Sequence, residues 1–523
     1  MTKQNYDHEV TRGLVYNLLG VLGKAFNPIF FIVVGRMYGA DALGVYLLVF
    51  VFIEMLKKLA VGGLNDGVMI FAARYLARRD ERNAYQALAN SIVLCAGVGL
   101  LLCLALLLGA SGALPMYSEG RIQSLLRLMA PGLPLQAAAV LLVSATKAHA
   151  EMKWDALLQG CIRPFGLFVC ALLFAALDFG VDGLGYGYTA TSAVMFAAAL
   201  VIFCRSFSMK RLLLAFRRFR FMRPLLVFVL PQSLNLTFTD MIAGFDVMML
   251  GFFGVQPALI GYYGIAAQIV HNIEQVRLAF SGAYTPVIAR LYGEQRPDEM
   301  NVSYNKVSRW TMLLAFPLGF LVIFFRHELL QLFHPAFGVP FALPMNALLP
   351  GALISVLRLE YLGDMGATGF MILLTLVPLL SCGIGLAGNV ITALGKSAWS
   401  LANSVTVAGL SFLFAALFIP VYGLFGAALA AVLAAVSIRL IQIMEARFLL
   451  GVRLRRREVY KPYIAALVSG ALLLFADISD LGYFWLKLPA IILILGVYFG
   501  ILKCLGFEEG DARVLMLWKK RKE

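Results

Sequence analysis

Long uninterrupted runs of apolar residues dominate this sequence. A helix that crosses a bilayer needs roughly 20 mostly apolar residues, and windows of that length recur along the whole chain. The alternation over about 10 residues that marks membrane β-strands is absent. The pattern predicts an all-α, polytopic membrane protein with about fourteen transmembrane helices. We expect the spans at 12–34, 42–64, 86–109, 125–147, 157–178, 185–205, 223–250, 256–282, 307–327, 366–392, 398–420, 423–448, 460–477 and 484–505.

Composition supports a lipid environment. The chain is 61% hydrophobic and 14% charged, with a mean hydropathy of +0.84, whereas soluble domains carry about 25% charged residues. The first apolar run is too long for a signal peptide and lacks a cleavage site, so it is expected to remain as the first helix. The seven cysteines show no C-x-x-C spacing and are expected to be small buried hydrophobes.

The net charge of +15 follows the expected topology. With a cytoplasmic N-terminus, 32 of the 44 Lys and Arg residues fall in cytoplasmic segments and 5 in outer loops. This is the positive-inside asymmetry expected of an inner-membrane protein with both termini in the cytoplasm. The basic surplus therefore indicates topology, with contact to anionic membrane lipid as a side effect, and requires no nucleic acid.

Two short motifs recur along the chain. Gly44 with Tyr46 begins the second expected helix, and Gly261 with Tyr263 begins the eighth. A second pair, FGVDG and YGLFG, begins the sixth and twelfth. The pattern predicts two parallel six-helix lobes, an architecture of transporters. We expect an N-lobe at 1–222, a C-lobe at 223–452 with an outer-loop insertion at 328–365, and two extra helices with a basic tail at 453–523.

Polar residues at membrane depth mark candidate substrate contacts, because charges in hydrocarbon are costly and usually functional. Lys24 lies near the midplane and has no partner within its own helix, although a cross-helix ion pair with Asp240 is an alternative. Glu54 precedes Lys57 and Lys58 at spacings that allow mutual neutralisation. The first expected helix has a polar face of Asn17, Lys24 and Asn27, and the seventh has one of Gln232, Asn235, Thr239 and Asp246, which Asp240 flanks. The eighth has a broad polar band of Gln268, His271, Asn272, Glu274, Gln275 and Arg277.

Motifs for enzymatic chemistry are missing. The sequence has no G-x-x-x-x-G-K-[ST] phosphate loop, no H-E-x-x-H and no G-x-S-x-G. With five histidines in all, metal catalysis is not expected, and we predict no cofactor and no catalytic residue. Transport would be driven by a gradient or by substrate supply.

Several stretches resemble the bacterial polysaccharide and O-antigen flippases, within the multidrug/oligosaccharidyl-lipid/polysaccharide exporter superfamily. They are NPIFFIVVGRMYGADALGVY (27–46), GFDVMMLGFFGV and GYYGIAAQI (within 244–269), ITALGKSAWSLANSV (391–405) and IPVYGLFGAALA (419–430). The resemblance spans about residues 10–450, and the last two stretches are the most specific. The insertion at 328–365 departs from the family pattern.

The resemblance implies a flippase that moves undecaprenyl-pyrophosphate-linked oligosaccharide from the cytoplasmic to the periplasmic leaflet. It implies that cationic residues meet the pyrophosphate, for which Lys24 is the first candidate and Arg36, Lys57 and Lys58 are the others. Asn17, Asn27, Gln232, Asn235, Thr239, Gln268 and Asn272 would then contact sugar. Asp240, Asp246 and Glu274 are candidates for ion coupling. A polysaccharide polymerase or glycosyltransferases would be partners, besides the lipid-linked glycan itself.

Two other functions remain open on the sequence. A cation-coupled multidrug extruder needs an acidic cavity, which Asp240, Asp246 and Glu274 could supply, although Lys24 argues against it. A membrane glycosyltransferase or O-antigen ligase would place catalytic groups such as His334 or Glu360 in the outer loop. Major facilitator transporters are disfavoured, because their G-x-x-x-D-R-x-G-[RK] motif is absent.

Overall fold

A computed structural model provides the fold. It describes residues 23, 26–109, 120–149, 151, 153–230, 233, 244–294, 296–338, 367–384, 397–450, 456–478 and 484–506. Every regular element in these ranges is helical, and eight helices there are long and apolar enough to cross a membrane. The all-α membrane class is confirmed, while the count of fourteen stays a prediction. The chain divides into two compact units, 1–262 and 263–523.

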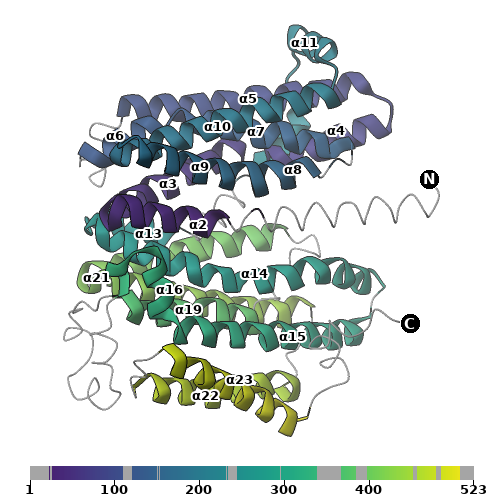
Figure 1. The fold of residues 1–523 in the computed structure, drawn as a ribbon. Helices are drawn as coiled ribbons and strands as arrows, with labels where there is room; N and C mark the ends of the chain where they lie inside the picture. Colours follow the sequence, from purple (N-terminus) through teal and green to yellow (C-terminus); the bar gives the residue numbers. More distant parts are fainter. Residues whose placement is uncertain are drawn as a thin grey trace, which may run out of the picture. The chain divides into compact units, whose positions relative to one another are not determined.

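Unit 1 is built around one central helix. The chain runs through α2 (Phe26–Val33), a π-helical turn (Val34–Tyr38) and α3 (Gly39–Val61), whose residues from Ala42 to Val49 are all buried. Helices α7 (Gly132–Thr146) and α10 (Gly180–Ser206) pack on α3 and on each other (Figure 1). The remaining helices are α4 (Leu64–Ala77), α5 (Glu81–Gly109), α6 (Gly120–Met129), α8 (Lys153–Leu157), α9 (Arg163–Ala176), α11 (Met209–Arg217) and α13 (Phe245–Phe252).

The outward faces of unit 1 are apolar. On α5, Leu101 is 66% exposed and Leu108 is 79% exposed. A row of exposed leucines on so long a helix would be costly in water. Acyl chains are as apolar as leucine and accept it. These faces identify the lipid-facing side of the helix.

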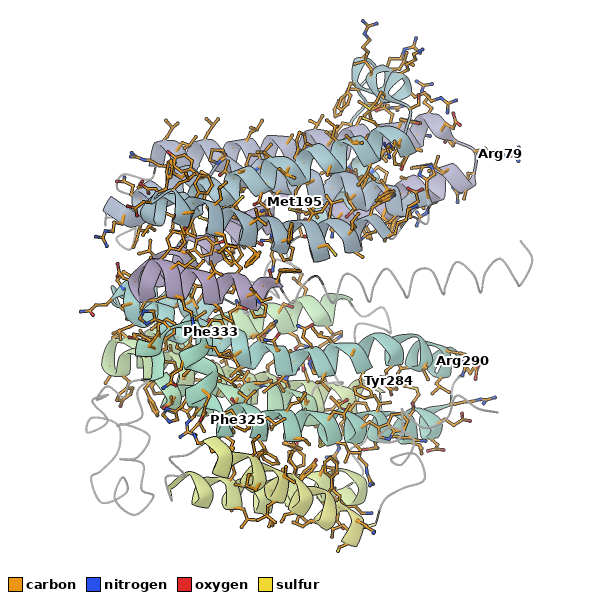
Figure 2. All side chains as sticks on the ribbon, viewed as in Figure 1. Arg79, Met195, Tyr284, Arg290, Phe325 and Phe333 are labelled. Atoms are coloured by element: carbon orange, nitrogen blue, oxygen red, sulfur yellow. The ribbon has the colours of Figure 1, made fainter. Side chains whose placement is uncertain are left out.

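A cytoplasmic loop was expected at 65–85, but α4 occupies most of it. The segment has a 3.6-residue pattern of its own, with Leu64, Val68, Phe71 and Ala72 buried on one side. At 14 residues it spans about 21 Å, too short to cross a membrane by itself. The connection to α5 is a tight turn in which Arg79 has a φ of 58°, and Figure 2 shows Arg79 at that end of the helices.

Unit 2 contains the rest of the described helices. They are α14 (Pro257–Gly293), which begins in unit 1, α15 (Pro297–Phe324), α16 (Arg326–Phe333), α19 (Ala367–Ile384), α21 (Ser397–Leu450), α22 (Arg456–Ile478) and α23 (Phe484–Cys504). Figure 2 shows Arg290 of α14 and Phe325 after α15 toward opposite ends of these helices. Helix α16 overlaps the start of the outer-loop insertion expected at 328–365, and positions 339–365 of that insertion lie outside the described residues.

The two C-terminal helices pack against α15 through one hydrophobic core. Phe316 and Phe320 of α15 meet Tyr498 and Leu502 of α23 there, and Leu473 of α22 joins them. The edge of the Phe320 ring meets the Tyr498 ring at 5.8 Å between centroids. Helices α22 and α23 are therefore an integral part of unit 2.

Helix α21 contains a kink at Gly423. Its φ of 53° and ψ of −126° are not helical, so α21 consists of two helices that meet at Gly423, at the boundary of the spans expected at 398–420 and 423–448. Asn403 Nδ2 donates to Glu445 Oε2 at 2.6 Å, so the two helices lie against each other. We expect Gly423→Ala to cost about 1–2 kcal/mol of unfolding free energy, because L-residues are strained at positive φ. Gly409→Ala in the same helix is the matched control, since neither glycine has a neighbour within 4 Å of a built Cβ. Equal thermal unfolding of the two variants would show that the kink carries no strain.

Candidate functional site

A group of buried polar side chains lies in unit 1 at membrane depth. It consists of Glu54, Lys57, Gln136, Arg163, Tyr188 and Ser192, and we call it the Glu54 cluster. Helices α3, α7, α9 and α10 each contribute to it. Charged groups in such a place need partners, because removing them from water is expensive.

Glu54 is the centre of the cluster. Its Oε2 accepts a hydrogen bond from Lys57 Nζ at 2.5 Å, and its Oε1 accepts one from Arg163 Nη2 at 2.5 Å. The three side chains are 9–18% exposed. One carboxylate therefore serves two cations in a largely desolvated site. The Arg163 guanidinium also lies over the Phe50 ring, 5.7 Å from its centroid.

Neutral groups extend the network away from Glu54. Lys57 Nζ also donates to Gln136 Oε1 at 3.2 Å, and Gln136 Nε2 donates to Ser192 Oγ at 3.0 Å. The Tyr188 hydroxyl donates to Glu54 Oε1 at 3.3 Å. Gln136 and Ser192 are 1% and 0% exposed, so these bonds replace water that cannot reach them.

Local structure explains how these groups meet. Glu54 and Lys57 share a face of α3 because they are three residues apart. Arg163 follows a π-helical turn at Leu158–Ile162, which shifts the face that α9 presents to α3. Such turns are rare and often lie at functional sites. The other π-helical turn of unit 1, Val34–Tyr38, contains Arg36.

A second charged group lies in unit 2, and we call it the Arg439 group (Glu274, Arg277, Ser381, Arg439 and Gln442). Arg277 Nε donates to Glu274 Oε1 at 2.5 Å on α14. Arg439 of α21 donates to Gln442 Oε1 at 2.7 Å and to Ser381 Oγ at 3.1 Å. Arg439 interacts electrostatically with both Arg277 and Glu274.

The charge balance of the two groups is the same. The Glu54 cluster contains one carboxylate with Lys57 and Arg163, and the Arg439 group contains one carboxylate with Arg277 and Arg439. Each therefore has a surplus of one positive charge among the side chains that the structure describes. An uncompensated cation at membrane depth favours an anion nearby.

The cations predicted to meet a pyrophosphate have different surroundings. Lys57 is buried in the Glu54 cluster, where the predicted pairing with Glu54 is present. Lys58 is half-buried one residue further along α3, and Arg36 is exposed on its π-helical turn. Asn27, predicted to contact sugar, is exposed near the start of α2.

The predicted polar band of α14 is present in the structure. Gln268 and Asn272 are exposed, and Asn272 Nδ2 donates to the Gln268 carbonyl oxygen at 3.0 Å. Glu274 is engaged by Arg277, as their spacing suggested. Asp246 lies in the first turn of α13, where the Val247 amide donates to its Oδ1 at 2.9 Å.

The remaining predicted residues lie outside the described part of the chain: Asn17, Lys24, Gln232, Asn235, Thr239 and Asp240. Gly23, next to Lys24 in sequence, is described. A Cβ built on it would lie 2.2 Å from the Gly160 carbonyl oxygen, so the backbone at Gly23 touches the π-helical turn that precedes Arg163. Among the described residues no group of three or more His, Cys, Asp or Glu side chains could hold a metal ion.

Sequence reasoning missed Arg163, Arg439 and Gln136. Both arginines stand inside apolar spans, which marks them as unusual, but their helices offer no partner at i+3 or i+4 of opposite charge. Their partners lie on other helices, so the pairing could not be inferred from spacing. Gln136 is not even unusual in this way, because a single uncharged polar residue in an apolar span does not by itself indicate a buried hydrogen-bond network.

The chain is similar to known membrane transporters in its fold. The MatE family profile matches residues 225–339. No curated protein matches this sequence. The structure described as an inward-facing multidrug resistance MATE family transporter of the MOP superfamily is 16% identical, with a TM-score of 0.65, covering 84% of this chain and 98% of that one.

Two further structures agree. The lipid II flippase MurJ, in an inward closed conformation, is 14% identical with a TM-score of 0.70, covering 96% of this chain and 100% of that one. A MOP superfamily transporter from Pyrococcus furiosus is 16% identical with a TM-score of 0.57, covering 84% and 95%. This chain has the fold of a MOP-superfamily transporter. The first two of these structures are described as a multidrug transporter and a lipid II flippase.

Proposed function

We propose that the chain is a flippase that moves undecaprenyl-pyrophosphate-linked oligosaccharide, such as a repeat unit of O-antigen or exopolysaccharide, from the cytoplasmic to the periplasmic leaflet by alternating access. The observation that supports it is the positive surplus of both the Glu54 cluster and the Arg439 group. A transporter for organic cations would require the opposite balance.

The physical task fits a polar path through the bilayer. A sugar hydroxyl dragged into hydrocarbon without a hydrogen bond costs roughly 2–7 kcal/mol, and an oligosaccharide has many hydroxyls. Polar side chains such as Asn27, Gln268 and Asn272 would replace those bonds. The pyrophosphate would be met by Lys24, Arg36, Lys57 and Lys58, together with Arg163 and Arg439.

Glu54 has a specific place in this proposal. Because it holds both Lys57 and Arg163, a substrate phosphate must compete with a carboxylate for these cations. This competition would make binding reversible, which transport requires. The chain would act in the inner membrane with both termini in the cytoplasm, alongside the glycosyltransferases and polymerase that make and use the glycan.

Multidrug extrusion is the second candidate, supported by the similarity to a MATE family multidrug transporter. Its cation-binding carboxylates would be Asp240, Asp246 and Glu274. Glu274 is engaged by Arg277, at 2.5 Å, which weakens its attraction for an organic cation.

Proteoliposomes can separate the two functions. We expect the purified chain to flip a polyprenyl-pyrophosphate-linked oligosaccharide and to leave the distribution of a cationic dye unchanged. Arg439→Gln should slow flipping at least tenfold, which is about 1.4 kcal/mol of transition-state free energy, and Lys24→Ala should abolish it. Arg290→Gln, which removes a charge from a side chain that is 70% exposed, is the matched control.

The same comparison in cells uses surface glycan as the readout. In a strain that lacks the chromosomal copy, Lys24→Ala should reach the membrane at normal level and fail to restore export. Normal glycan with this variant contradicts the pyrophosphate role, and export of the dye without lipid flipping supports multidrug extrusion instead.

A further inference from the structure

The segment that follows α10 is strongly basic. Residues 205–223, which we call the basic connector, contain seven Arg and Lys residues and no Asp or Glu. All seven are exposed: Arg205, Lys210, Arg211, Arg217, Arg218, Arg220 and Arg223. The distribution of basic residues along the chain predicts that this segment lies on the cytoplasmic side. The proposed function uses none of these residues.

The basic connector is held firmly on α5. Gln86 Nε2 donates to the carbonyl oxygens of Ala215 at 3.2 Å and Arg218 at 2.8 Å, and Gln86 Oε1 accepts from the Arg220 amide at 3.1 Å. Asn90 Nδ2 donates to the Arg220 carbonyl oxygen at 2.9 Å, and Asn90 Oδ1 accepts from the Met222 amide at 3.1 Å. Gln86 and Asn90 are 7% and 1% exposed. Five side-chain bonds thus fix the backbone of the segment.

Helix α11, inside the connector, has an unused apolar face. Leu212 and Ala215 are buried on the side of α5, whereas Leu213 and Leu214 are 61% and 56% exposed. Since Lys210 lies three and four residues before Leu213 and Leu214, these three side chains share the outer face. Figure 1 shows α11 outside the other helices of unit 1, beyond α5. Packing among the described residues of unit 1 therefore does not bury these two leucines.

Aromatic residues continue this surface beyond the helix. Phe219 and Phe221 are 42% and 57% exposed and alternate with Arg218 and Arg220. Exposed leucine and phenylalanine interleaved with lysine and arginine are the composition of helices that lie in the interface of a bilayer. The long basic side chains can extend to headgroups while apolar neighbours enter the acyl boundary.

We propose that the basic connector binds anionic phospholipid headgroups of the cytoplasmic leaflet, with Leu213, Leu214, Phe219 and Phe221 inserted at the acyl boundary. The connector itself contains no Asp or Glu, which fits a negatively charged surface, although Arg211 pairs with Glu81 of α5. The four exposed apolar side chains favour lipid over RNA or an acidic protein, which would leave them in water. The proposal does not depend on which substrate is transported.

Lipid-borne quenchers test this directly. Leu214→Trp is reconstituted in nanodiscs of one fixed mixture of phosphatidylglycerol and phosphatidylcholine, with bromine on the acyl chains of either one lipid or the other. The fluorescence of the five native tryptophans is subtracted using the parent chain. We expect stronger quenching when phosphatidylglycerol carries the bromine.

Charge variants provide the matched comparison. Lys210→Gln/Arg217→Gln in the probe chain should lower the preference for phosphatidylglycerol by about fivefold for each charge removed. Arg290→Gln/Arg296→Gln removes two exposed charges elsewhere and should leave the preference unchanged. Equal quenching by the two brominated lipids, no quenching by either, or equal effects of the two double variants would each overturn the proposal. The first two results need only the probe chain, so they do not depend on the folding of a charge variant.

Discussion

Glu54→Gln is expected to lower the free energy of unfolding by about 3–5 kcal/mol, because it leaves two buried cations without a carboxylate. Lys57 and Arg163 both contact Glu54 at 2.5 Å, and their side chains are only 9% and 18% exposed. The amide keeps the shape of the carboxylate, so the loss reflects charge and not packing. Thermal unfolding of the purified chain in detergent measures the effect.

An exposed ion pair is the appropriate control. Arg121 and Asp41 pair at 3.1 Å with side chains 70% and 51% exposed, so Asp41→Asn should cost less than about 1 kcal/mol. The double variant Glu54→Gln/Arg163→Gln should recover part of the loss, since it removes one of the orphaned charges. If Glu54→Gln unfolds at the same temperature as the unsubstituted chain, the Glu54 cluster is not desolvated.

Gly44→Ala is expected to destabilise unit 1 by at least about 3 kcal/mol, the upper range for overpacking a close contact. A Cβ on Gly44 would lie 1.6 Å from the carbonyl oxygen of Pro257 and 2.4 Å from its carbonyl carbon. These are backbone atoms, so no rotamer change can relieve the clash. Helix α3 and the start of α14 would have to separate, and the measured result should be a lower unfolding temperature and less protein in the membrane.

Gly97→Ala is the control for Gly44→Ala. Gly97 lies in α5 with nothing within 4 Å of a built Cβ, so alanine should be neutral or stabilising by about 0.5–1 kcal/mol, its helix propensity advantage. Gly261→Ala should resemble Gly44→Ala in direction, because its Cβ would lie 2.8 Å from the Ala40 carbonyl oxygen. Equal unfolding temperatures for Gly44→Ala and Gly97→Ala would show that α3 and the start of α14 are not in close contact at Gly44.

Gly44 and Gly261 were recognised from the sequence, but the reason for glycine at these positions came from the structure. The sequence singled out Gly44 and Gly261 because each begins an expected helix with a nearby tyrosine. The structure shows a different reason for glycine, which is that the two backbones touch: a Cβ on Gly261 would lie 3.1 Å from the Gly44 amide nitrogen. Small residues allow such approach between membrane helices. Repeat matching alone could not predict contact between its two members.

Several details of the fold also required the structure. Helix α4 was expected to be a loop because its charges obscure a buried apolar face. The break between the spans at 398–420 and 423–448 was expected, but the positive φ of Gly423 at that break is a conformation that the hydrophobic pattern does not encode. The basic connector was counted only as cytoplasmic charge, because nothing local indicates that Gln86 and Asn90 would hold its backbone.

The sequence by itself determined the membrane class, the positions of the long apolar helices and the uneven distribution of basic residues. These follow from the cost of moving each side chain into hydrocarbon, which depends on the residue and its depth and not on its neighbours. Only the tertiary structure decided that Glu54 holds Arg163, 109 positions away, and that Arg439 joins Arg277. Which helix faces meet is set by packing over the whole bundle, so the partner of a buried charge is not encoded in the segment that carries it.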